Sequence, residues 1–433
     1  MKRTTKPVYL QKNSLSSNLC SMSVVQFTQV LSRGCGMDIH KKVVVATVQG
    51  EGLSKETRSY DTFTRSLTQL REWLVSLGIT HVAMESTGVY WKPIYNVFEG
   101  FIPHIWIVNA RHIKNVPGHK TDKNDSEWIC QLLMAGLLKP SFIPPKAQRE
   151  LRDLTRYRRK LIQSVSANKN RIIRILEDGN VKLSSVLSDT SGATAVKLID
   201  MLCDGKQITL SDIESVRHGR CQHTAEDMLE ACTGCIDEHK VYMLSKIREC
   251  NASLKEDILD FDKRIKEALS SYSDAIDRLC EIPGIQNRVC EDLVAEIGLD
   301  MSNFPTSAHL CSWAGMCPGN NESAGKKKSG RTNHGDKQVK ETLVEAAWAA
   351  SRAKGTFFME RFNRLAPRKG NKKALIAVGH SLLKCIHYVL STGGRYKELG
   401  DSYVPNKKEQ KRKEYLKKEL QKLGYCVQLS KED

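Results

Sequence analysis

Residues 33–49, "RGCGMDIHKKVVVATVQ", decide the fold of the first part of the chain. Two short runs rich in β-forming residues flank a tight polar turn, a pattern typical of a β-hairpin. Periodicity then predicts a helix over 63–78, a strand over 79–86, a helix over 88–100, a strand over 102–110 and a helix over 124–138. Strands that alternate with helices after an opening hairpin indicate an α/β domain with a mixed sheet, covering residues 33–146.

The charge of the chain indicates the class of its partner. The sequence has 67 Lys and Arg against 49 Asp and Glu, a net charge of +18. The electric field of a positive net charge attracts phosphate backbones, and their binding releases counterions. Nucleic acid is therefore the leading partner class. No run of about 18 apolar residues is present, and the polar, Ser-rich residues 1–32 lack the apolar core of a signal peptide. We therefore expect a weakly ordered N-terminal extension on a cytoplasmic protein that does not enter a membrane.

Fourteen cysteines are scattered through the chain rather than packed into a short secreted domain, so most are expected to be reduced. One group has part of the spacing of a zinc site: Cys221, His223, Cys232, Cys235 and His239. Its first pair is C-x-H and the intervening loop is short. Zinc is therefore unlikely, and ordinary structural thiols are expected.

A helical linker is predicted over residues 147–275. Paired prolines in residues 139–148, "KPSFIPPKAQ", stop the preceding helix. The next helix carries apolar residues on one side and many cations on the others, and residues 239–269 would return antiparallel as a coiled-coil-like hairpin. The cations suit either a phosphate backbone or a solvated structural arm, and the candidates for nucleic-acid binding are Arg149, Arg152, Arg156 and Arg159.

A mostly helical C-terminal domain is predicted over residues 276–392. Two helices flank "IPGI", residues 282–285, as in a helix-hairpin-helix, whose turn around Gly284 brings backbone N–H groups toward a phosphate; a plain αα-turn has the same pattern. Residues 317–336 are too polar for a core and predict a surface loop, followed by a helix from about Lys337. Residues 393–433 form a basic tail.

Four carboxylates occupy suggestive positions in the α/β domain: Asp38, Glu85, Asp122 and Asp125. The first two end predicted strands and the last two open a helix, and these ends share one rim of an open sheet. Four carboxylates cannot all ionise together unpaired, but Mg²⁺ prefers such ligands and a two-metal site serves in-line attack on a phosphodiester. The structural alternative is an N-cap at Asp122, with Asp125 favouring the helix dipole.

These acids stand in long motifs: "GMDIHK" from residue 36, "MESTGVYWKPIYNVFE" from 84, "VNARHIKNVPGHKTDKNDSEWICQLL" from 108, and "CPGNNESAGKKKSGRTNHGD" from 317. In this order they resemble the insertion-sequence transposases of the DEDD class, the Piv-like and bridge-RNA-guided recombinases. The resemblance covers roughly residues 33 to 390. It implies a RuvC-like domain of RNase H fold, a coiled-coil linker, and a C-terminal domain with a serine nucleophile.

By motif position, the resemblance gives Asp38, Glu85, Asp122 and Asp125 the role of Mg²⁺ ligands, and Ser323 that of the nucleophile that links to DNA. Ser329, before a glycine in the same segment, is the competing choice. Cations beside the serine would offset phosphate charge, namely Lys326, Lys327, Lys328 and Arg331. Two features depart from the family: the extension before residue 33 is longer than usual, and the cysteine group around 221–239 has no evident equivalent.

Three hypotheses follow. The first is a site-specific DNA recombinase that uses Ser323 together with the acids, is guided by a structured RNA, and acts as a homo-oligomer. The second is a metal-dependent junction nuclease that works through the carboxylates alone. The third is a non-catalytic nucleic-acid-binding protein from a decayed element, which the presence of all four acids and the serine argues against.

Overall fold

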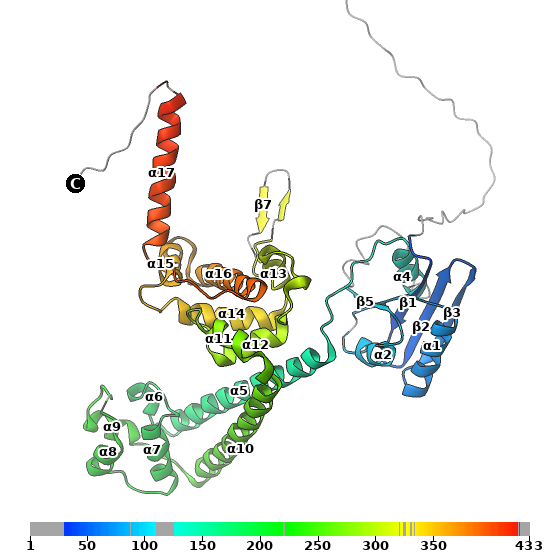
Figure 1. The fold of residues 1–433 in the computed structure, drawn as a ribbon. Helices are drawn as coiled ribbons and strands as arrows, with labels where there is room; N and C mark the ends of the chain where they lie inside the picture. Colours follow the sequence, from blue (N-terminus) through cyan, green and yellow to red (C-terminus); the bar gives the residue numbers. More distant parts are fainter. Residues whose placement is uncertain are drawn as a thin grey trace, which may run out of the picture. The chain divides into compact units, whose positions relative to one another are not determined.

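The computed structural model describes residues 30–86, 88–109, 125–219, 221–319, 321–323, 326–329, 331–332, 334–422 and 424. The chain divides into two compact units, residues 1–143 and 144–433 (Figure 1). Most of the predicted N-terminal extension and Asp122 lie outside the described residues. The second unit contains both the predicted linker and the predicted C-terminal domain, so their separation as domains stays a prediction.

The first unit is built on a five-stranded mixed sheet of order β3-β2-β1-β4-β5. Its strands are β1 (Arg33–Ile39), β2 (Val43–Gly50), β3 (Leu53–Asp61), β4 (His81–Glu85) and β5 (His104–Val108). β2 is antiparallel to β1 and β3, whereas β1, β4 and β5 run parallel. The predicted hairpin and mixed sheet are confirmed.

The third strand, β3, was not predicted. Its sequence, "LSKETRSYD", is mostly polar, and none of its residues is buried. An edge strand that is solvated on both faces has no apolar alternation for a sequence to reveal. The opening of the fold is therefore a three-stranded meander rather than a hairpin alone.

Helices cover both faces of this sheet. One apolar core joins β1, β2 and β4 to α1 (Thr64–Ser76) and α2 (Trp91–Phe98), and its buried side chains include Met37, Leu70 and Phe98. A second core, containing Ala83, Ile129 and other residues, joins the opposite face to α4 (Asp125–Met134). These helices lie within the predicted ranges, so the periodicity identified them correctly.

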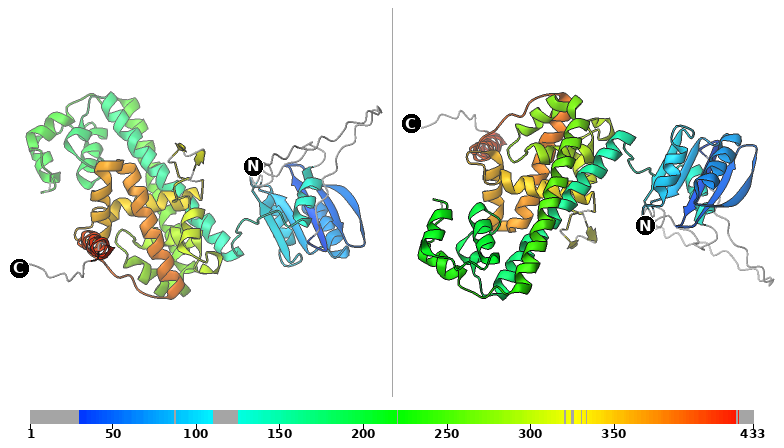
Figure 2. Two further views of the ribbon diagram at one scale, coloured as in Figure 1. Left: turned by 90° about the horizontal axis from the view of Figure 1, so that it is seen from above. Right: turned by 90° about the horizontal axis from the view of Figure 1, so that it is seen from below.

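A long antiparallel helix pair forms the arm of the second unit. α5 (Lys146–Asp178) and α10 (Glu238–Ala268) lie side by side in both views of Figure 2. The Tyr157 and Phe261 rings are 5.1 Å apart, and Asn168 Nδ2 donates to Asn251 Oδ1 at 2.9 Å. The predicted antiparallel return is confirmed. At the far end, a separate core holds α6 (Leu183–Val186), α7 (Ala193–Cys203), α8 (Leu210–Val216) and α9 (Ala225–Cys232).

The body of the second unit is a helical bundle around one apolar core. Its helices are α11 (Ser273–Cys280), α12 (Asn287–Ile297), α13 (Ser307–Trp313), α14 (Lys337–Ala350), α15 (Phe357–Lys369) and α16 (Asn371–Thr392). Short 3₁₀ turns span Ser270–Tyr272 and Met301–Asn303, and α17 (Tyr403–Lys422) lies in the predicted basic tail. Among the helices within the described ranges, α16 is the one long and apolar enough to cross a membrane by length and composition. Its buried Val378, Leu382 and Ile386 belong to this core, as in the central helix of a bundle.

Candidate functional site

The structure sets Asp38 and Glu85 next to each other at the carboxyl ends of two parallel strands. Met37 of β1 pairs in register with Met84 of β4, and both side chains are buried in the core beneath α1 and α2. Successive side chains of a strand point to opposite faces. Asp38 and Glu85, one residue further on, therefore share the opposite face of the sheet, on which α4 packs.

Helix α4 brings Asp125 to the same end of the sheet. An ideal Cβ on Gly36 would lie 2.4 Å from the carbonyl oxygen of Ser126, and one on Gly34 would lie 2.8 Å from Sδ of Met134. The missing side chains let the helix backbone approach β1 directly. Because the first turn of α4 lies over Gly36 and its last turn over Gly34, the helix runs antiparallel to β1. Asp125, its first residue, is thus at the strand end that carries Asp38.

Hydrogen bonds hold the first turn of α4 in place. Oγ of Ser126 is 2.8 Å from Oγ1 of Thr47 on β2, in a buried position. Glu127 forms an ion pair with Lys55 of β3. Asp38, Glu85 and Asp125 are half-buried. The Asp38 side chain is 16% exposed, and its Oδ2 lies 3.0 Å from Nε2 of the exposed His40.

The acids share one end of the sheet, but within the described residues no three His, Cys, Asp or Glu side chains are grouped closely enough to hold a metal ion. Asp122 lies outside those residues. The donors nevertheless match a hard divalent cation in chemistry, since Asp and Glu oxygens are the ligands that Mg²⁺ prefers. The structure therefore places Asp38, Glu85 and Asp125 at one end of the sheet, on the face that α4 covers.

Ser323 lies in a β-hairpin rather than in an irregular surface loop. β6 (Asn321–Ser323) pairs antiparallel with β7 (Lys326–Ser329), and Ser323 is in register with Lys326. A bridge between Pro318 and Thr332 and a bond from the Gly319 amide to the Arg331 carbonyl, 2.7 Å, continue the ladder toward the body. The prediction of a loop was wrong because polar strands of three or four residues carry little propensity signal. Figure 1 draws this hairpin projecting from the body beside α13.

Both ends of the hairpin segment are fastened to the helical body. After it, Asp336 accepts a hydrogen bond from the Val339 amide at 3.0 Å and caps α14, which begins at Lys337 as predicted. Before it, Met316 packs on Gly379 of α16, where an added Cβ would lie 2.6 Å from the methionine methyl. The hairpin is therefore a short projection on a rigid base.

Comparison with known families identifies the chain. Residues 35–180 match a transposase family of the DEDD class and IS110 type, and residues 276–362 match the family described as Transposase IS116/IS110/IS902. The two segments together cover more than half of the chain. The chain belongs to the IS110-type DEDD transposases. No curated protein matches it.

The first matched segment of the transposase contains the four acids, and the second contains Gly284 and Ser323. Transposases cleave and rejoin DNA, so the chain is an enzyme with DNA as its partner. Members of the DEDD class typically depend on a divalent metal. The resemblance of the sequence motifs to this family is thus confirmed.

The arginines of α5 are occupied by contacts within the transposase. Arg156 binds Glu296 of α12 through two bonds of 2.6 and 2.8 Å, and Arg152 donates to the carbonyl of Ala295 at 3.0 Å. The hydrogen bonds to Glu296 raise the pKa of the Arg156 guanidinium, while burial lowers that of Arg152. Arg159 donates to Oγ1 of Thr342 at 2.7 Å and pairs with Glu345, both on α14.

The same helix buries a further arginine that sequence reasoning did not select. Arg158 is 1% exposed and contacts three carboxylates: Asp262 at 2.8 Å, Asp292 at 2.7 Å, and Glu291. Arg149, for its part, donates to the carbonyl of Pro144 at 3.0 Å. These contacts make the arginine stripe of α5 a docking surface for α10, α12 and α14, and they favour the structural interpretation of the arm over direct phosphate contact.

Gly284 also has a structural reason to be glycine. The two helices predicted around the turn are present as α11 and α12, and Gly284 adopts φ +85° between them. A Cβ there would lie 2.4 Å from the carbonyl oxygen of Ala346 on α14. Both the left-handed backbone and the close approach exclude a side chain. A phosphate contact at this turn stays a prediction.

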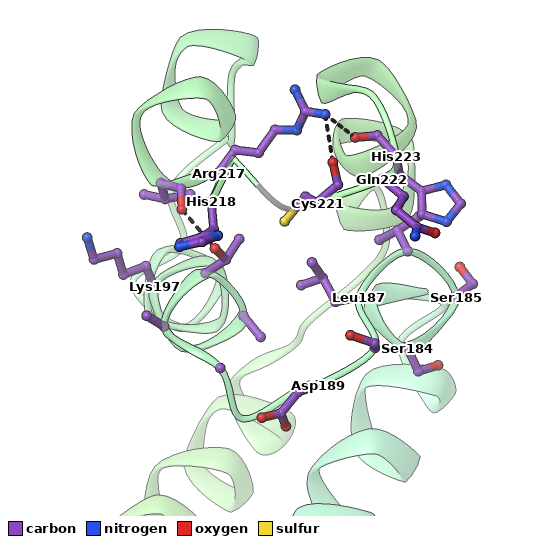
Figure 3. Close-up of a pocket in the computed structure, with 17 residues that line it drawn as sticks. Ser184, Ser185, Leu187, Asp189, Lys197, Arg217, His218, Cys221, Gln222 and His223 are labelled. Atoms are coloured by element: carbon purple, nitrogen blue, oxygen red, sulfur yellow. Dashed lines mark hydrogen bonds between the residues drawn. The ribbon is translucent and has the colours of Figure 1, made fainter. Parts of the chain in front are cut away.

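Within the described ranges, the residues of the cysteine group do not form a cluster that could hold a metal ion. Cys232 is buried in the core at the far end of the arm, and burial raises the pKa of its thiol to about 11. Cys221 lines a pocket of about 710 Å³ between α6, α7 and α8, which Figure 3 shows with Lys197, His218 and His223 at its walls. Arg217 on the rim donates to the carbonyls of Cys221 and His223 at 3.1 and 2.6 Å. The pocket falls outside both segments that match the transposase families.

Proposed function

We propose that the chain is the recombinase of its insertion sequence and that it cleaves and rejoins DNA strands through a phosphoserine at Ser323. Asp38, Glu85, Asp122 and Asp125 would hold Mg²⁺. The observation that carries the proposal is the arrangement of three of these acids: Asp38 and Glu85 in register on adjacent parallel strands, with the N-terminus of α4 at the same end. The sheet order β3-β2-β1-β4-β5 supports a RuvC-like domain of RNase H type.

Placement of the acids supports their use with a metal. Carboxylates at one end of the sheet repel one another, and a divalent cation would offset this repulsion. When bound, Mg²⁺ would neutralise charge that develops on the transferring phosphoryl group. The acids would position the ion, and the packing of α4 on Gly34 and Gly36 would hold Asp125 at a constant height above β1.

Chemistry at the serine balances without an external energy source. Oγ of Ser323 attacks the phosphorus and one bridging P–O bond breaks, while a base takes the serine proton and passes it to the departing oxygen, which leaves as a hydroxyl. A strand hydroxyl from the partner duplex then attacks the phosphoserine, re-forms a phosphodiester and releases the serine. Each bond broken is replaced by one formed. Lys326, Lys327 and Lys328 in β7, the strand paired with that of Ser323, would add positive charge to the surroundings of the pentacoordinate phosphorus.

A guide RNA and self-association complete the proposal. The resemblance to bridge-RNA-guided recombinases and the net charge of +18 support a structured RNA as a second partner in the cytoplasm, beside the nucleoid. Joining strands of two duplexes requires more than one nucleophile, which supports a homo-oligomer. Sequencing the RNA that co-purifies with the chain tests the first point, since a discrete species from the flank of the element is expected.

The serine assignment is tested by trapping the covalent intermediate. We expect the protein, purified with its RNA and incubated with donor DNA and Mg²⁺, to yield a protein–DNA adduct after denaturation, with the linked peptide of residues around Ser323 identified by mass spectrometry. Ser323→Ala, Asp38→Asn and removal of Mg²⁺ by a chelator should each abolish it. Ser329→Ala is the matched control because it removes a hydroxyl from the paired strand, and it should keep the adduct. An adduct that survives Ser323→Ala but not Ser329→Ala would transfer the role to Ser329; strand cleavage by Ser323→Ala without any adduct would favour a nuclease that uses the carboxylates alone.

A further inference from the structure

Helices α15 and α16 carry an unusual charge distribution. Between Glu360 and Glu398 the sequence contains no Asp or Glu, whereas it contains nine Lys and Arg. Hydrophobic periodicity does not reveal such a run of cations. The residues predicted from the sequence to bind nucleic acid therefore did not include it. In the structure, part of this run is gathered in one place.

Three cations and a histidine lie near one another along the α15–α16 pair: Arg361, Arg364, Lys384 and His380. Nε of Arg361 reaches the carbonyl of Ala377 on α16 at 3.3 Å, which places it one turn from His380. Arg364 follows Arg361 on the same face of α15, and Lys384 follows His380 on α16. We call these four residues the α15–α16 cation cluster.

Across the residues that the structure describes, none of the four side chains of this cluster lies within ion-pair distance of an Asp or Glu. Nε of Arg364 is buried and has no hydrogen-bond partner there. An unpaired buried donor is costly, and like charges held together add repulsion. A fold keeps such an arrangement at a cost in stability, which an anionic ligand would offset.

The direction of the pKa shift of His380 agrees with this geometry. Burial lowers the pKa of its imidazole, and Lys384 and Arg361 lower it further. Burial and Arg364 likewise lower the pKa of Arg361. The neighbours that act on each group are cations, so the local field favours a negative ligand.

The position of the cluster connects it to the hairpin that carries Ser323. Sγ of Cys311 on α13 lies 3.8 Å from the carbonyl oxygen of His380. The adjacent Gly379 packs on Met316, which precedes the hairpin by five residues. The cluster therefore stands on the part of the body to which the hairpin is fastened.

We propose that the α15–α16 cation cluster is a binding site for the phosphodiester backbone of a nucleic acid. Two guanidinium groups supply planar, paired donors that match phosphate oxygens, the ammonium adds charge at the edge, and the imidazole adds charge when it is protonated. Because DNA and RNA share this backbone, the site could bind either of them. This proposal rests on the proposed function and adds where the enzyme holds a nucleic-acid backbone. Its test is separate from the test of Ser323.

The test measures binding of duplex DNA and of duplex RNA of the same sequence by fluorescence anisotropy across a salt series. Arg361→Gln/Arg364→Gln is compared with Arg174→Gln/Arg264→Gln, which removes the same charge from exposed positions on α5 and α10. We expect the cluster variant to lose roughly tenfold in affinity for at least one duplex. We also expect its slope of log K against log salt to fall by about one to two, and the control to change little.

The outcomes separate the sources of the phosphate. A loss on RNA alone assigns the cluster to an RNA partner, a loss on DNA alone assigns it to the substrate, and a loss on both assigns it to a backbone common to both; each supports the site. Equal losses in the cluster variant and the control, or none in the cluster variant, overturn it. Thermal unfolding in inorganic phosphate provides a second readout, in which the ion should raise the Tm of the natural protein more than that of the cluster variant. Failure of this test would leave the Ser323 adduct unaffected.

Discussion

Two groups of arginines in the second unit differ in what surrounds them. On α5, Arg156 and Arg158 face Glu296, Glu291, Asp292 and Asp262, and their charges are satisfied within the protein. On α15, Arg361 lies near Arg364 and near His380 of α16, and no Asp or Glu among the described residues lies within ion-pair distance of either arginine. The first arrangement is typical of a structural joint and the second of a surface for an anion. A basic helix is therefore interpretable only together with its neighbours.

The largest expected effect comes from breaking the joint at Arg158. Arg158→Met leaves three partly buried carboxylates facing one another without their common partner, and we expect the free energy of unfolding to fall by about 3 kcal/mol. Unfolding in urea, followed by circular dichroism, measures the change. Arg174→Met on the same helix is the control, because its side chain is exposed, and it should change stability by no more than about 0.5 kcal/mol. Equal midpoints for the two variants would contradict the structural role given to the α5 arginines.

A smaller effect is expected from converting the cluster into a joint. Oγ of Ser381 and Nε of Arg361 both contact the carbonyl of Ala377, at 3.1 and 3.3 Å, so an aspartate at 381 would lie beside the guanidinium. Ser381→Asp should weaken nucleic-acid binding roughly tenfold while stabilising the free protein by up to about 1 kcal/mol.

The control for this change is Ser391→Asp, which alters the net charge equally at an exposed position on the same helix. Anisotropy and thermal unfolding should show a much smaller change in this variant. Weaker binding together with lower stability in Ser381→Asp would indicate damage to the fold, and it would count against the inference that the cluster lacks a counter-charge.

The smallest expected effect is a pH dependence that originates at His380. Its pKa is lowered by burial and by Lys384 and Arg361, so the folded free protein binds fewer protons below about pH 6.5 than the unfolded chain does. Stability should therefore decrease as the pH falls through this window. Binding should respond in the opposite direction, because a phosphate favours the protonated imidazole, and affinity should rise by less than tenfold per pH unit. The thiol of Cys311, which contacts the His380 carbonyl, has its pKa raised by burial to about 12 and does not titrate in this range.

His380→Gln separates this effect from the titration of the nucleic acid itself. The variant should keep the binding at pH 8 and lose the gain on acidification. Affinity that rises equally in the natural protein and the variant between pH 8 and 6 would show that His380 does not contact the phosphate.

Much of the first unit was predictable from its sequence, and so was one edge of the candidate site. Short runs of apolar and β-branched residues identified β1, β2, β4 and β5, because each of these strands buries side chains in a core. The rule that strand ends share a rim placed Asp38, Glu85 and Asp125 together, and the register of β1 and β4 agrees with it. The polar edge strand β3 and the short hairpin of Ser323 could not be predicted in the same way, since neither contributes apolar residues to a core.

By itself, the sequence determined which segments fold into helices and strands, the class of partner, and the order of motifs that reveals the transposase family. These follow from local periodicity and from charge, which need no knowledge of neighbours. Only the tertiary structure decided which cations are free to bind an anion. That property depends on whether a carboxylate from a distant segment lies within a few ångströms. Glu296 lies this close to Arg156, whereas no Asp or Glu among the described residues lies this close to Arg364.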